Sequence, residues 1–179
     1  VLNIVWNGTI RYFDHQSKLI NILANDNRFR IYYHGIGPDY DRLKNFCNDN
    51  QVKNVFFTGE YNNLNKSSLL DNADILNNSY KTKKESEVLY AISNKYYDGI
   101  IFGIPQLVES NTFKQKKVEA LGIGIAPDFN FKFADQLYNF YFDINQKAFN
   151  DSCDRELDNI LEEENNYVKL IEKFIFTND

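Results

Sequence analysis

Short apolar segments alternate with amphipathic segments along this chain, and this alternation constrains its fold more than any other feature. The apolar segments have the length and the flanking turn residues of buried strands. We expect strands at residues 2–6, 28–34, 52–58, 73–77, 106–109 and 122–126, the last at a sheet edge. Helical patterns are found at residues 18–23, 39–47, 64–70, 85–92, 113–121, 134–142 and 151–176. We therefore predict one α/β domain over residues 1–179, a Rossmann-like, doubly wound parallel sheet of about six strands with helices on both faces.

Length, charge and cysteine content narrow the class of protein. The chain has 179 residues, enough to bury a substantial core, and a net charge of −5. An acidic domain lacks the broad basic face that nucleic acid requires, so we expect no nucleic-acid partner. Cys47 and Cys153 are far apart and form no metal-ligand pattern, which favours a reducing, cytoplasmic setting. No segment approaches the roughly 20 apolar residues of a membrane span, so any membrane association would be peripheral, at the inner face.

Turn-forming segments follow five of the expected strands. They cover residues 8–11, 35–38, 59–62, 77–80 and 109–112. Ligands of doubly wound sheets bind beyond the carboxyl ends of the strands, where these segments meet. Glycine recurs in them, at Gly8, Gly35, Gly37 and Gly59, and allows tight turns or a close approach of backbone to a ligand. We expect the functional site at this edge of the sheet.

Residues 93–108 combine a polar start, an apolar middle and a Gly-Ile-Pro end, which predicts a short helix leading into a buried strand. Ser93 or Asn94 can cap the first helical turn, whose unpaired amide groups attract anions. Lys95 lies in that turn, where a cation opposes the helix dipole. Either an anion binds nearby, or Lys95 is an ordinary surface lysine.

This segment resembles the donor-binding, C-terminal half of GT-B fold glycosyltransferases, particularly bacterial capsular or surface polysaccharide transferases (glycosyltransferase group 1-like). The matching residues are Ser93-Asn94-Lys95, Asp98 and Gly103-Ile104-Pro105. Weaker matches occur in the same order along residues 2–126, including the turn Gly35-Ile36-Gly37-Pro38. The resemblance implies transfer of a sugar from a nucleotide-sugar donor to a glycan or lipid-linked acceptor, with no metal or other cofactor. It also implies an N-terminal acceptor domain of the same polypeptide, before Val1, without which the present chain would be inactive.

The resemblance also implies roles for individual residues. Arg11 and Lys95 would act on the diphosphate as the catalytic cations, and Asp98 would bind the ribose hydroxyls. Tyr61 would stack on the base. The other donor-binding candidates are Gly8, Gly37, Ser93 and Asn94. The last helix would pack toward the N-terminal half.

Three positions depart from the family pattern. In the family pattern an arginine directly follows the glycine that corresponds to Gly8, and Thr9 stands at that position here. The pattern has a lysine a few residues later, and Asp14 lies in that region. Tyr90 stands where many retaining members have the first of two glutamates, while Asp98 matches the second. These departures leave two alternatives open. One is a non-catalytic nucleotide- or carbohydrate-binding module with a degenerate transferase fold, and the other is a nucleotide-sugar epimerase of the same fold.

Other polar residues have simpler interpretations. His15 and His34 could titrate near neutrality, and His34 ends a strand at the ligand edge, but packing against Tyr32 or Tyr33 explains it better. The acidic residues at the start of the helix at 39–47 suit helix capping rather than metal binding.

Overall fold

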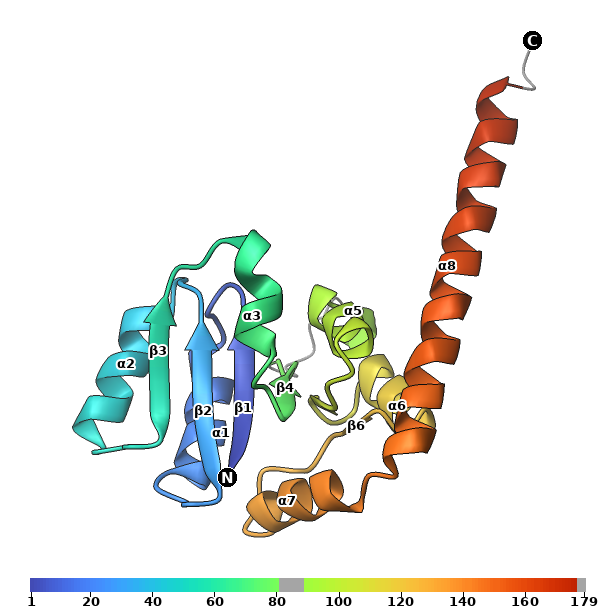
Figure 1. Ribbon diagram of the computed structural model, residues 1–179. Coiled ribbons are helices and arrows are strands. Elements are labelled where there is room, and N and C mark those ends of the chain that lie inside the picture. The colour runs from blue at the N-terminus through green and yellow to red at the C-terminus, as the bar shows by residue number, and fades with distance from the viewer. Residues whose placement is uncertain (81–88, 177–179) are drawn as a thin grey trace.

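The computed structural model describes residues 1–80 and 89–176, and its centre is a six-stranded parallel sheet. The strands are β1 (Leu2–Asn7), β2 (Phe29–His34), β3 (Val55–Gly59), β4 (Ile75–Asn77), β5 (Gln106–Leu107) and β6 (Gly124–Ile125). They lie in the order β3-β2-β1-β4-β5-β6 (Figure 1). The chain thus builds the sheet outward from β1, first to one side and then to the other, and the predicted doubly wound parallel sheet is confirmed.

Helices occupy the segments between the strands. Among the described residues they are α1 (Phe13–Leu23), α2 (Tyr40–Asp49), the single-turn η1 (Asn63–Asn65), α3 (Lys66–Leu70), α5 (Asn94–Ile101), α6 (Phe113–Ala120), α7 (Phe133–Asp143) and α8 (Gln146–Phe176). Residues 85–88 of the helix expected at 85–92 lie outside the described part, and of the other half only residues 89–90 are helical. The final helix begins before residue 151, because the side chain of Asn145 accepts a hydrogen bond from the Ala148 amide and stabilises an earlier first turn.

The third strand starts later than its apolar pattern predicts. Residues 52–58 were expected to be extended, but β3 begins at Val55. The reason is that Asn54 ends the preceding loop: its side-chain amide donates to the carbonyl oxygens of Leu23 and Phe29, at 2.8 and 3.2 Å. The Asn54 side chain is thereby held against the end of α1, while its carbonyl oxygen accepts the first hydrogen bond from β2, from the Ile31 amide at 2.8 Å.

Alternating side chains of β1 pack on opposite faces of the sheet. Ile4 and Trp6 contribute to a core with residues of α1, α2 and α7, whereas Val5 packs with Leu70 of α3 and Leu76 of β4. A third cluster joins α5, α6 and the beginning of α8, around Tyr96. Because both faces of the parallel sheet are buried, polar groups can gather only in the loops at the two ends of its strands.

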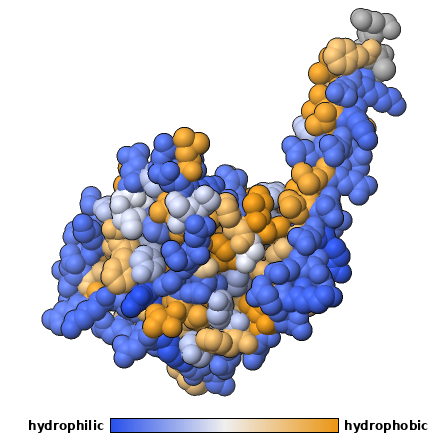
Figure 2. Space-filling model, viewed as in Figure 1, coloured by the Kyte–Doolittle hydropathy of each residue, from blue (hydrophilic) through white to orange (hydrophobic). Residues whose placement is uncertain are grey.

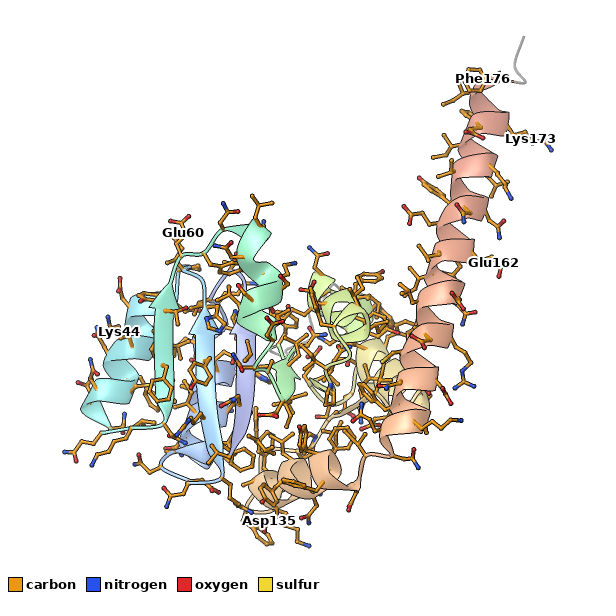
Figure 3. All side chains as sticks on the ribbon, in the orientation of Figure 1. Lys44, Glu60, Asp135, Glu162, Lys173 and Phe176 are labelled. Atoms are coloured by element: carbon orange, nitrogen blue, oxygen red, sulfur yellow. The ribbon has the colours of Figure 1, made fainter. Side chains whose placement is uncertain are left out.

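The carboxyl edge of the sheet carries the loops that concern function. Glu60, which directly follows β3, lies at this edge, and Asp135 of α7 lies at the opposite edge (Figure 3). There the carboxylate of Asp135 accepts a hydrogen bond at 2.7 Å from Arg28, the residue before β2. The amino edge is therefore closed by α7, and the carboxyl edge is free to hold a ligand.

Helix α8 extends well beyond the body of the molecule (Figure 1). Its first turns are anchored, since Phe149 and Cys153 are buried and Tyr96 donates a hydrogen bond of 2.8 Å to Glu156. Beyond Ile160 its side chains are exposed and include many apolar ones, visible as orange atoms along the protruding part (Figure 2). No helix of the described residues has the length and apolar character needed to cross a membrane. Packing of α8 toward an N-terminal half stays a prediction.

Candidate functional site

A polar hollow lies at the carboxyl edge of the sheet, where the chain order reverses between β1 and β4, and we call it the switch-point hollow. Its volume is about 480 Å³. Ligands of doubly wound sheets bind at this position because the loops of the two central strands diverge there. The residues around the hollow come from β1 and its loop, the β3–α3 region, Tyr80 and the start of α5. They are Asn7, Gly8, Thr9, Arg11, Tyr61, Asn63, Lys66, Tyr80, Ile92, Ser93, Asn94, Lys95 and Asp98.

All the residues predicted from the sequence for this site line the hollow, except Gly37. Gly37 lies against the backbone of Ile10, where an added Cβ would be 2.3 Å from the Ile10 carbonyl oxygen. Gly35 similarly faces the backbone of Gly8, and a Cβ there would be 2.1 Å from the Gly8 oxygen. The glycines of this turn therefore support the loop after β1 by allowing close backbone contact, and do not themselves face the hollow.

Lys95, in the first turn of α5, is a buried lysine at the edge of the hollow. The side chain lies over Trp6, with Nζ 3.7 Å from the ring centroid, and Nζ donates a hydrogen bond of 3.0 Å to the Tyr80 hydroxyl. Burial, followed by the charges of Lys114 and Arg11, lowers the pKa of Lys95 to about 7. The interpretation of Lys95 as an ordinary surface lysine is wrong. This cation is held in a position that disfavours its charge until an anion is present.

Arg11 is the second cation of the hollow and, unlike Lys95, is exposed. Its guanidinium lies 4.9 Å from the ring centroid of Tyr12 and 5.9 Å from that of Tyr80. These aromatic faces hold the planar cation in place without neutralising it. Arg11, from the loop after β1, and Lys95, from the first turn of α5, thus line the same hollow, and both contact Tyr80.

Asp98 is the acidic residue of the hollow, one helical turn after Lys95. Its carboxylate accepts a hydrogen bond of 3.0 Å from the Asn7 side-chain amide. It also forms an ion pair with Lys66, whose Nζ lies 3.1 Å from Asp98 Oδ1. Asn7 is 4% exposed, and its Oδ1 has no hydrogen-bond partner among the described residues. Because the amide turns its N–H group toward the carboxylate, its oxygen is an available acceptor at the hollow. The same side chain also interacts with the Tyr61 hydroxyl and acts to lower the pKa of that group.

The helix start beside these residues is not capped in the expected way. Ser93 is at the N-cap position of α5, but its hydroxyl donates to Asn78 Oδ1 at 2.6 Å and makes no capping hydrogen bond. The Tyr96 amide donates to the Ser93 carbonyl oxygen at 2.9 Å, whereas the Ser93 side chain caps neither of the two amides before it, those of Asn94 and Lys95. Tyr61 lines the same hollow, and burial raises its pKa, with Lys66 and Asp98 both acting on it electrostatically.

A buried ion pair supports the loop that carries Tyr80. Glu109 accepts a hydrogen bond of 2.8 Å from the Tyr80 amide and pairs with Lys114 at 3.0 Å. Lys114 also donates to the Asn78 carbonyl oxygen, at 2.6 Å. Burial raises the pKa of Glu109, whereas burial lowers that of Lys114 to about 8. Both side chains are 1% exposed, so the pair is a structural element behind the hollow.

Replacing Lys114 by methionine is expected to lower the free energy of unfolding by about 3 kcal/mol, because it leaves the Glu109 carboxylate buried without its cation. Urea titration of the variant measures this loss. The matched control is Lys147→Met, which removes an exposed pair (Lys147 88% exposed) and should change stability by less than about 0.5 kcal/mol. Adding Glu109→Gln to Lys114→Met should recover about half of the loss. Equal effects of the two lysine variants would contradict a buried charged pair.

The two histidines are not among the residues that line the switch-point hollow, and burial lowers the pKa of both. Burial, followed by Lys114 and Lys18, lowers the pKa of His15 to about 4, and burial also lowers that of His34. His34 stacks on Tyr32 with ring centroids 6.1 Å apart, as expected for a packing residue, and its Nδ1 is 2.8 Å from the Thr58 hydroxyl. Desolvation therefore overrides the ordinary titration that the sequence suggested.

Sequence reasoning assigned no role to several lining residues, among them Asn7, Lys66 and Tyr80. Asn7 ends β1 and Tyr80 follows β4 at the carboxyl edge, so their positions were a usable signal. Lys66 had none, because it reaches Asp98 from a helix that lies 32 residues earlier in the chain. Two of the residues that depart from the family pattern are placed differently. Thr9 lines the hollow, whereas Tyr90 is 73% exposed and is not among the lining residues.

Solved structures of glycosyltransferases share this Rossmann-like fold, several of them over less than half of their own length. AviGT4, a glycosyltransferase involved in avilamycin A biosynthesis, is similar over 87% of this chain and 46% of its own, with a TM-score of 0.67 and 11% identity. Anabaena HepE in complex with UDP is similar over 87% of this chain and 43% of the HepE chain, with a TM-score of 0.65 and 14% identity. The catalytic domain of the Helicobacter pylori cholesterol-α-glucosyltransferase is similar over 90% of this chain and 98% of its own, with a TM-score of 0.63 and 16% identity.

These likenesses are structural, at low sequence identity. No protein-family model matches the chain, and no curated protein matches its sequence. The chain spans less than half the length of AviGT4 and of Anabaena HepE.

Proposed function

We propose that this chain is the donor-binding, C-terminal half of a glycosyltransferase, which holds a nucleoside-diphosphate sugar in the switch-point hollow. One observation carries the proposal: Arg11, from the loop after β1, and Lys95 and Asp98, one turn apart in α5, all line this single hollow. A diphosphate needs cations and amide donors, and a ribose needs hydrogen-bond acceptors. The hollow offers both kinds of group.

The arrangement suits departure of a nucleoside diphosphate. Its phosphate oxygens would meet the amide groups at the start of α5, the Lys95 ammonium and the Arg11 guanidinium. Negative charge grows on the leaving diphosphate as the bond to the sugar breaks, and fixed cations stabilise that charge. We propose on this basis that the reaction needs no metal ion or other cofactor. The ribose hydroxyls would donate to Asp98 and to the unpartnered oxygen of Asn7.

The wider setting is proposed from the family resemblance and from the neighbours. Anabaena HepE was crystallised with UDP, and WaaB, another structural neighbour, is a lipopolysaccharide outer core galactosyltransferase. We propose a bacterial capsular or surface polysaccharide transferase that works in the cytoplasm, with a glycan or lipid-linked acceptor held by an N-terminal domain of the same polypeptide. The present chain alone is then expected to bind donor without transferring sugar.

The direct test is isothermal titration calorimetry of the chain with UDP, GDP, ADP, CDP and dTDP. We expect at least one of them to bind with a micromolar dissociation constant, since several charge-assisted contacts are available. Inorganic phosphate at equal ionic strength controls for simple anion binding. Failure of all five diphosphates to bind would overturn the proposed function.

A second candidate is a non-catalytic binding module with a degenerate transferase fold. Thr9 favours it, because this residue lines the hollow where the family resemblance implies a cation, and so does the exposed Tyr90. The polypeptide before Val1 discriminates between the two. A second α/β half there supports the transferase, and an unrelated module supports the binding protein.

A further inference from the structure

Lys66 has a role in the switch-point hollow that neither the sequence pattern nor the resemblance assigns. It is the first residue of α3, and its Nζ lies 3.1 Å from Oδ1 and 3.3 Å from Oδ2 of Asp98. Its side chain is 28% exposed, whereas that of Asp98 is 11% exposed. A partly exposed lysine thus covers a nearly buried carboxylate at the place where a ribose is proposed to bind.

The carboxylate of Asp98 has few free acceptor positions in this arrangement. Asn7 donates to Oδ2, and Lys66 contacts both oxygens. A pair of ribose hydroxyls therefore has to compete with the Lys66 ammonium for the same oxygens. Asn7 Oδ1 is buried and has no hydrogen-bond partner within residues 1–80 and 89–176, so this atom is a further acceptor that a ribose hydroxyl can use.

We propose that Lys66 is a displaceable counter-ion, which leaves Asp98 when a ribose binds and takes a phosphate of the same ligand as its new partner. The proposal rests on the proposed function. Its consequence is selectivity: a nucleoside without phosphates must displace Lys66 at a net cost, whereas a nucleoside diphosphate provides the displaced cation with an anion. The site would then discriminate against free nucleosides.

Lys66 is better suited to move than Lys95. Lys95 is 7% exposed and is held by Trp6 and Tyr80. Lys66 belongs to a five-residue helix near the rim of the hollow, and its ion pair is partly solvated. Such pairs contribute no more than about a fivefold change in an equilibrium constant, so a phosphate contact can replace one readily.

The experiment compares wild type with Lys66→Met, using the best-bound diphosphate from the panel, its matched nucleoside and inorganic pyrophosphate. Calorimetry measures the two phosphate ligands, and ligand-observed NMR measures the nucleoside. We expect the variant to bind the diphosphate and pyrophosphate about tenfold more weakly, because a charge-assisted contact is lost. It should bind the nucleoside about threefold more tightly, because the competitor is gone. The ratio of nucleoside to diphosphate dissociation constants should fall about thirtyfold.

Two further variants make the result specific. Lys66→Arg retains a cation and should keep the ratio within about threefold of wild type. Lys53→Met removes an exposed lysine at the other edge of the sheet, before β3, and should change none of the three affinities. If Lys66→Met weakens or leaves unchanged the binding of the nucleoside, or if it leaves pyrophosphate binding unchanged, the counter-ion proposal is wrong. In that case the proposed function stands, since it fails only when no diphosphate binds to wild type.

Discussion

Replacing Lys95 by methionine is expected to weaken nucleoside diphosphate binding at pH 7 by about a hundredfold without lowering stability. The affinity falls because a desolvated ammonium group next to the phosphates is lost, worth about 3 kcal/mol. Stability should stay equal or rise, since methionine fills the space over Trp6 without burying a charge. Calorimetry with the best-bound diphosphate and urea unfolding measure the two effects. A variant that loses stability and affinity together would indicate that Lys95 mainly supports the fold.

The same residue predicts how binding and stability depend on pH. The groups that face Lys95 are Lys114, Arg11, Asp98, Lys66 and Tyr80. The pKa of Lys95 is about 7 in the empty protein, against 10.5 for an ordinary lysine. A bound diphosphate favours the charged form, so binding takes up a proton above about pH 7 and weakens as the pH rises.

The pH dependence of folding stability has the opposite sign to that of diphosphate binding. Between about pH 7 and pH 10.5 the unfolded chain carries a proton on Lys95 that the folded chain does not. Stability of wild type should therefore rise over this window relative to Lys95→Met. Lys95→Arg stays charged throughout and should remove the pH dependence of binding. Identical pH profiles for wild type and Lys95→Arg would contradict the lowered pKa.

Replacing Asp98 by alanine is expected to weaken binding of the same diphosphate by about a hundredfold, through loss of hydrogen bonds from the ribose to a charged acceptor. Binding of inorganic pyrophosphate should be unchanged or tighter, because Lys66 loses its partner and becomes available to the anion. Opposite responses of the two ligands would assign Asp98 to the ribose rather than to the phosphates.

The control for Asp98→Ala is Asp49→Ala, at the exposed end of α2, which should leave both affinities unchanged. Removing an acidic residue near a helix carboxyl end does not destabilise the helix. Equal loss of diphosphate and pyrophosphate binding in Asp98→Ala would show that the variant disturbs the hollow as a whole.

Local sequence patterns were sufficient for most of the fold. The segment 93–108 was expected to form a helix and a strand, and it forms α5 and β5. Apolar spacing, glycine and proline act over a few residues, so the sequence itself carries this information. The same holds for the place of the site, since a parallel sheet always brings the carboxyl ends of its strands to one edge. Arg11 could be selected because it follows such an end, whereas Lys95 and Asp98 were selected from the resemblance of segment 93–105 to the family pattern and from the place of Lys95 in a first helical turn.

What the sequence by itself determined is therefore the alternation of strands and helices and the edge of the sheet that carries the polar loops. Only the tertiary structure decided which groups meet there: Lys66 pairs with Asp98, Trp6 and Tyr80 bury Lys95, and Gly37 packs on Ile10 outside the hollow. Backbone periodicity is a property of neighbouring residues. Burial, and with it the charge state and partners of a side chain, depends on segments that lie far apart in the chain and come together only when the sheet assembles.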